Sequence, residues 1–137
     1  MYRIVLDTNV YISALLRGGK PEIILKCSHN PYKYELCTSI EILKELDRDF
    51  REKFFWSPVD RDKVTRRISY RAEVVKTTKS ISAIAADEKD DRILECAIKA
   101  KADYIVSGDK HLLDLKQYKG IKILKPAQFL TLLEKER

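Results

Sequence analysis

The stretch that decides the fold is Ile4-Val5-Leu6-Asp7-Thr8-Asn9, near the start of the chain. Its first three residues form a short apolar run rich in β-branched side chains, which predicts a buried strand. Asp7 ends that run, and Asn9 to Arg17 has helical character until Gly18-Gly19 stops it. The chain therefore passes from a buried strand into a helix, with a carboxylate at the junction.

The same change from strand to helix recurs along the chain. Further strands are predicted at Tyr34 to Cys37, Tyr104 to Val106 and Ile121 to Leu124, and 80–86 is irregular or a short strand. The predicted helices that follow or separate the strands begin at Pro21, Thr38, Asp60, Lys89, Lys110 and Pro126. This alternation predicts a three-layer α/β/α fold with a central parallel sheet of four to five strands, as a single domain over residues 1–137.

Composition narrows the class of protein. Of 137 residues, 45% are hydrophobic and 35% charged, which suits a soluble globular domain. No apolar run approaches a membrane span of about 20 residues, and the acid at position 7 does not fit a signal peptide. The cysteines at 27, 37 and 96 have neither disulfide nor zinc spacing, so we expect buried thiols in a reducing cytoplasm.

The net charge of +6 is concentrated in one region. Residues 51–79 hold nine basic and four acidic side chains, a local excess of +5. A helix predicted from Asp60 to Val75 places Lys63, Arg66, Arg67 and Arg71 mostly off its apolar stripe. This basic face is either a solvated exterior or a surface that holds phosphates. The neighbouring aromatic residues 54–56 could stack on bases, but they more often belong to a core or a dimer surface.

Four acids are predicted to meet at one rim of the sheet. Asp7 and Asp109 each follow a strand directly, Glu45 lies one turn into the helix after the second strand, and Asp90 begins a later helix. In parallel sheets, ligands bind beyond the carboxyl ends of the strands. Crowded carboxylates repel one another unless a cation neutralises them, and oxygen ligands without His or Cys suit Mg²⁺ or Mn²⁺.

Each acid also has a structural alternative. Asp7 and Asp109 fit helix N-caps, and the series from Asp87 to Asp90 fits a cap with its partner. Thr38 and Glu41 fit a capping box, which would leave Glu45 for chemistry. Asp91 lies about 100° around the helix from Asp90, and Asp87 is a candidate auxiliary ligand.

These motifs together resemble the PIN domain, a family of metal-dependent ribonucleases, and in particular the VapC-type toxins of toxin–antitoxin pairs. Four stretches carry the resemblance, in order and along most of the chain: 4–9, 38–46, 87–97 and 102–113. Their matching acids are Asp7, Glu45, Asp90 and Asp109. Thr8, Asn9 and Ser107 match polar residues that support the site, with Asp87 and Asp91 as further candidates.

The resemblance implies a function. The four matching acids would act as catalytic residues and as ligands for one or two Mg²⁺ or Mn²⁺ ions in the hydrolysis of RNA, with Lys63, Arg66, Arg67 and Arg71 on flanking phosphates. It also implies a homodimer and a small antitoxin partner. The alternatives are a non-catalytic PIN-like module that binds RNA or serves assembly, a nuclease that acts on DNA, and a phosphoacceptor receiver domain. Lys125-Pro126 suits a receiver, but the second strand ends in Cys37-Thr38-Ser39 without an acceptor Asp.

Overall fold

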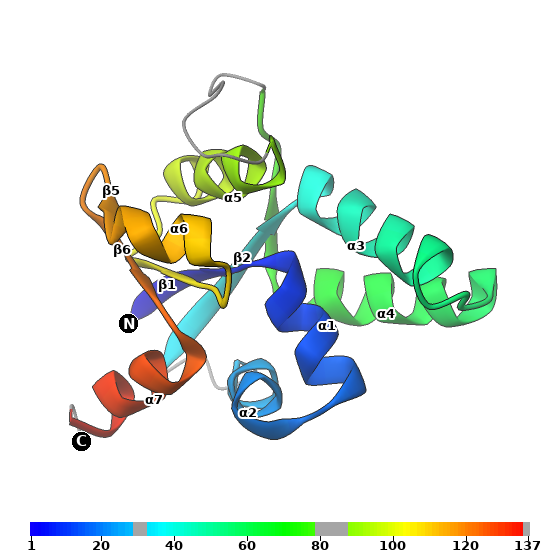
Figure 1. Ribbon diagram of the computed structural model, residues 1–137, viewed down its shortest axis with the longest axis horizontal. Helices are drawn as coiled ribbons and strands as arrows, with labels where there is room; N and C mark the ends of the chain where they lie inside the picture. Colours follow the sequence, from blue (N-terminus) through cyan, green and yellow to red (C-terminus); the bar gives the residue numbers. More distant parts are fainter. Residues whose placement is uncertain (29–32, 79–87, 136–137) are drawn as a thin grey trace.

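The fold is a six-stranded sheet with helices on both sides (Figure 1). A computed structural model describes residues 1–28, 33–78 and 88–135. The strands are β1 (Tyr2–Leu6), β2 (Tyr34–Ser39), β3 (Glu73–Val75), β4 (Tyr104–Val106), β5 (Gln117–Tyr118) and β6 (Ile121–Leu124). The helices are α1 (Thr8–Leu16), α2 (Gly19–Cys27), α3 (Ile40–Glu52), α4 (Pro58–Arg71), α5 (Glu88–Lys99), α6 (Lys110–Leu115) and α7 (Pro126–Lys135). This arrangement confirms the predicted three-layer α/β/α class.

The strand order β3-β2-β1-β4-β6-β5 places β1 at the centre of the sheet. All pairs are parallel except β5 with β6. Leu6 at the end of β1 lies opposite Val106 at the end of β4, so the residues after these two strands emerge side by side. Figure 1 shows α5 on one side of the sheet, α2 and α7 on the other, and the α3–α4 hairpin projecting from its end.

The central strands are buried on both faces. Ile4, Val5 and Leu6 are fully buried, and so are Ile105 and Val106 on the neighbouring strand. Such continuous apolar strands are expected where helices cover both faces of a parallel sheet. None of the helices in the described part of the chain is long and apolar enough to cross a membrane.

The cysteines are unpaired thiols, as predicted. Cys37 and Cys96 are buried, whereas Cys27 is only half-buried. Burial raises the pKa of the Cys37 thiol to about 11 and that of Cys96 to about 12, so both stay protonated near neutral pH.

Two predictions about the sheet are wrong in detail. In the described part of the chain the sheet has six strands rather than four to five, and β5 runs antiparallel to β6. The helix predicted to reach Val75 ends at Arg71, and the chain continues as β3. There Val74 and Val75 pair with Thr38 and Ser39 of β2, and this sheet pairing overrides the helical spacing of the apolar residues.

The predicted capping box at Thr38 is also wrong. β2 continues through Ser39, and the Ser39 hydroxyl caps α3 by accepting a hydrogen bond from the Ile42 amide at 3.2 Å. Thr38 is a buried strand residue, so Glu41 has no reciprocal role with it. The break predicted at Asn30-Pro31, the segment 80–86 and Asp87 lie outside the described residues.

Candidate active site

Asp7, Ser107 and Asp109 meet where β1 and β4 end. The Ser107 hydroxyl donates a hydrogen bond to Asp7 Oδ2 at 2.7 Å and accepts one from the Asp109 amide at 2.9 Å. The Asp7 amide donates to the Val106 carbonyl at 3.0 Å, which joins the two strand ends through the backbone. The serine therefore fixes both acids relative to each other, as expected from the adjacent strand ends.

Neither acid acts as a helix cap through its side chain. Asp7 precedes α1 and Asp109 precedes α6, at the N-cap positions, yet neither side chain makes a capping hydrogen bond. The capping interpretation is therefore wrong for Asp109, whereas the Asp7 carboxylate still interacts with the amides of Thr8 and Asn9 at the start of α1. Asp109 Oδ2 is buried and has no hydrogen-bond partner among the described residues. A buried acceptor of this kind is costly unless something outside the chain satisfies it.

The electrostatics of Asp7 also favour a positively charged ligand at this site. Burial raises the pKa of Asp7, and the negative charge of Asp109 adds to that rise. The hydrogen bond from Ser107 and the nearby amides of Thr8 and Asn9 offset the rise only in part. A positive charge placed between the two acids would offset both the burial of the Asp7 charge and its repulsion by Asp109, because it favours the charged form of each acid.

Glu45 lies in α3 and is engaged by two cations. Its side chain is only 13% exposed and pairs with Lys89 Nζ of α5 at 2.8 Å and with Arg48 of its own helix. Burial would raise the pKa of Glu45, but these two partners outweigh burial and lower it. The Glu45 carboxylate is therefore ionised and already neutralised from within the chain.

The remaining predicted site residues that the structure describes differ in how far their side chains are buried. Asp90 and Asp91 are both buried in the first turn of α5, so burial does not distinguish between them. Thr8 is buried at the start of α1, whereas Asn9 is exposed. Asp87 lies outside the described residues.

The donor set fits a hard divalent cation, although the full set is not assembled. Asp7 and Asp109 offer carboxylate oxygens at neighbouring strand ends, and Asp109 Oδ2 is unsatisfied among the described residues, which suits Mg²⁺ or Mn²⁺. Among residues 1–28, 33–78 and 88–135, no three His, Cys, Asp or Glu side chains lie close enough to hold a metal ion. Glu45 faces its two cations, and a metal would have to compete with them.

The basic face of α4 is exposed. Lys63, Arg66, Arg67 and Arg71 all lie at the surface, and Arg66 Nε pairs with Asp62 at 2.9 Å. Of the aromatic residues before this helix, Trp56 stacks on the buried Phe50 at 4.2 Å, whereas Phe55 is exposed. Trp56 is thus part of the packing, as the core interpretation expects.

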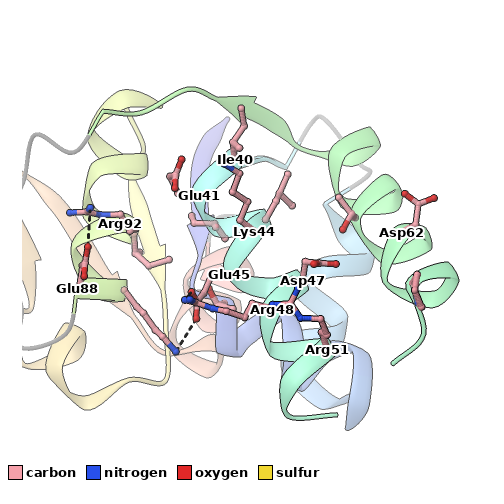
Figure 2. Close-up of a pocket in the computed structure, with 17 residues that line it drawn as sticks. Ile40, Glu41, Lys44, Glu45, Asp47, Arg48, Arg51, Asp62, Glu88 and Arg92 are labelled. Carbon is pink, nitrogen blue, oxygen red and sulfur yellow. Dashed lines mark hydrogen bonds and ion pairs between the residues drawn. The ribbon is translucent and has the colours of Figure 1, made fainter. Parts of the chain in front are cut away.

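Sequence reasoning missed a groove beside Glu45. The groove has a volume of about 1020 Å³ and is lined by residues of α3, α4 and α5, together with Thr8 (Figure 2). Its cations are Lys44, Arg48, Arg51, Lys89 and Arg92. The only sequence signal for it was the basic residue every third or fourth position along α3, which is also typical of an ordinary solvated helix face.

Fold and site define a class: a three-layer α/β/α protein with two acids, Asp7 and Asp109, at the carboxyl ends of its neighbouring parallel strands β1 and β4. A sequence model of the PIN domain matches residues 3–111, which is most of the chain. The chain therefore belongs to the PIN domain family, and this membership replaces the receiver-domain alternative.

Solved structures share the fold at low sequence identity. One is the VapBC2 complex of Rickettsia felis bound to a DNA fragment from its promoter: 14% identity, a TM-score of 0.63, and 88% of this chain and 96% of that chain covered. Another is PAE2754 of Pyrobaculum aerophilum: 13% identity, a TM-score of 0.59, and 98% of this chain and 90% of that chain covered. A comparison with curated proteins found no match.

Proposed function

We propose that this PIN domain is a metal-dependent endoribonuclease that hydrolyses RNA phosphodiester bonds. The observation that carries the proposal is the pair of neighbouring acids at the ends of β1 and β4, with Asp109 Oδ2 buried and unsatisfied among the described residues. Asp7, Glu45, Asp90 and Asp109 would hold one or two Mg²⁺ or Mn²⁺ ions. When bound, such an ion lowers the pKa of water and supplies a hydroxide nucleophile.

The protein's own residues have separate tasks in this proposal. Ser107 holds the Asp7 carboxylate through one oxygen and the Asp109 backbone through its amide, so the Asp7 side chain and the Asp109 main chain are preorganised. Asp7 must lose its proton to bind a cation, and its raised pKa makes that step dependent on pH. The exposed basic face of α4, with Lys63, Arg66, Arg67 and Arg71, is either a solvated exterior or a surface that holds RNA phosphates, and a variant of this face serves as the comparison in the test below.

Asp109→Asn is expected to lower metal-dependent RNA cleavage by more than the roughly 10–100-fold that loss of an outer-shell partner costs. The amide removes a charge but keeps the shape of the side chain. The measurement is the cleavage rate of a labelled RNA in Mn²⁺, in Mg²⁺ and in EDTA. Asp114→Asn is the matched control, because Asp114 is an exposed acid in α6, the helix that Asp109 precedes. Equal rates in both variants would contradict the assignment of Asp109.

A non-catalytic RNA-binding module is the second candidate, and one observation favours it. Glu45 is neutralised by Lys89 and Arg48, and the acids in the described part of the chain do not converge as a ligand set. Isothermal titration of the wild-type protein with Mn²⁺ separates the two functions. A nuclease centre binds Mn²⁺ with a heat that Asp109→Asn removes, whereas a module without a metal site gives no such heat.

We further propose that the chain is a cytoplasmic toxin that forms a homodimer and pairs with a small antitoxin. Its support is membership of the PIN family and the shared fold with the VapBC2 structure. Co-expression with the product of a neighbouring small reading frame should yield a stable complex that no longer cleaves RNA. A complex that cleaves as fast as the free chain would contradict the pairing, and gel filtration with light scattering measures the oligomeric state.

A further inference from the structure

We propose that Arg48, Arg51 and Lys89 form a phosphate-binding track for single-stranded RNA in the groove between α3 and α5. The inference rests on the proposed nuclease function and assigns the substrate backbone a place beside the candidate site. It differs from the basic face of α4 predicted by the charge pattern. The argument uses the direction of these side chains, the charges around them and the shape of the groove.

Two of the three cations already converge on one anionic group. Lys89 reaches Glu45 from α5 and Arg48 reaches it from the next turn of α3, so the two donors meet at a single carboxylate. Their side chains remain 47% and 53% exposed, respectively, which leaves both accessible from the groove. Donors arranged around a carboxylate are also arranged for the oxygens of a phosphate, since both ligands accept charge-assisted hydrogen bonds.

Arg51 extends the pair into a track. It follows Arg48 by three residues, so the two guanidinium groups lie about one turn apart on the same side of the helix. Figure 2 shows Glu45, Arg48 and Arg51 following one another along α3. Arg51 pairs only loosely with Glu52, at 3.3 Å between exposed side chains, and such a pair contributes little against a phosphate. The track therefore leads from the candidate site outward along α3.

Three acids that line the groove pair with cations outside the track, whereas Glu45 is held by the track cations Arg48 and Lys89 themselves. Asp47 pairs with Arg61 at 3.0 Å, Asp62 with Arg66 at 2.9 Å, and Glu88 with Arg92 at 3.7 Å. Arg48 and Lys89 share the single charge of the Glu45 carboxylate, so the two cations together carry one more positive charge than that partner balances. The groove is also continuous with the start of α1, because Thr8, next to Asp7, lines it.

Most of the basic face of α4 points away from this groove. Pro58, Asp62 and Thr65 are the α4 residues that line it. Lys63 precedes Thr65 by two residues and Arg67 follows it by two, so each lies about 200° around the helix from Thr65. These two cations thus serve as a matched control of equal charge outside the groove.

The test is binding of a short unstructured RNA by fluorescence anisotropy in EDTA, at several salt concentrations, so that neither cleavage nor metal affects the result. For single strands the salt slope changes by about 0.7 for each phosphate contact. Arg48→Gln with Arg51→Gln should flatten the slope by about 1.4, and Lys63→Gln with Arg67→Gln should leave it unchanged. Arg51→Gln alone should flatten it by about 0.7, and this variant leaves the partners of Glu45 in place.

Three results would overturn the track: equal flattening in both double variants, flattening only in the α4 pair, or no RNA binding by the wild-type protein in EDTA. These outcomes are separate from the fate of the proposed nuclease. RNA that binds along the track but is not cut in Mn²⁺ would overturn the catalytic proposal alone. Melting temperatures of all variants should stay close to wild type, because the substituted side chains are exposed.

Discussion

Asp7→Asn is expected to abolish metal-dependent RNA cleavage and, at the same time, to raise the melting temperature. Loss of cleavage follows from removing a charged ligand beside Asp109. The gain in stability follows from burial, because burial raises the pKa of Asp7 in the folded protein. A variant that is inactive and more stable cannot owe its inactivity to unfolding.

The sign of the stability change can be worked out from protonation. The folded protein binds the Asp7 proton more tightly than the unfolded chain does, since the folded pKa is raised. The stability contributed by this group is therefore present at low pH and decreases as pH rises through the folded pKa. Asn is neutral at every pH and can still accept the Ser107 hydrogen bond, so the variant should gain most over wild type near neutral pH and least in acid.

Asp49→Asn is the matched control for Asp7→Asn. Asp49 is as buried as Asp7, but its carboxylate lies 3.5 Å from Lys53 Nζ. Its charge is therefore compensated within the chain, and its removal should not raise the melting temperature or reduce cleavage. The measurements are thermal unfolding in EDTA across pH and cleavage in Mn²⁺. A variant at Asp7 that retains cleavage, or that melts below wild type near neutral pH, would contradict the assignment of Asp7.

The sequence predicts well those helices and strands whose ends are marked by turn residues or by proline. β4 ends at Val106, directly before Ser107-Gly108-Asp109, and α7 begins at Pro126, as the sequence predicts. One wrong boundary is at Arg71, where apolar spacing continues but Val74 and Val75 pair with β2. β5 is only two residues long and pairs antiparallel, so it has no periodic pattern to detect. Pairing between distant segments decides both cases.

In the candidate site, too, some contacts follow from local sequence patterns and others depend on the packing of distant segments. The meeting of Asp7 with Ser107 and Asp109 follows from two adjacent strand ends, which the alternation of strands and helices predicts. The ion pair of Glu45 with Lys89 depends on how α3 packs on α5, and no local pattern carries that information. The groove also depends on how helices pack. The sequence pattern therefore indicates the basic face of α4 but not the groove, which is lined mainly by α3 and α5.

Phe129→Ala is expected to lower the free energy of unfolding by about 3–5 kcal/mol, as for other large aromatic residues removed from a core. Phe129 lies on α7, beyond the residues matched by the PIN domain model, and is fully buried. Its ring packs edge-on against Tyr34 at 5.2 Å and tilted against Tyr104 at 6.1 Å. It therefore joins α7 to the two strands on either side of β1.

This substitution tests whether residues 1–137 form one domain. The Tyr34 hydroxyl donates to the Ile24 carbonyl at 2.6 Å, so the contact made by Phe129 also reaches α2, which packs on α1. In a single domain, loss of the Phe129 ring should lower the melting temperature of one cooperative transition by on the order of 10 °C. Far-ultraviolet circular dichroism and tyrosine fluorescence should then report the same transition. Thr131→Ala, exposed on the same helix, should leave the transition unchanged. An unchanged main transition in Phe129→Ala would instead make α7 a separable addition to a PIN domain that is stable without it.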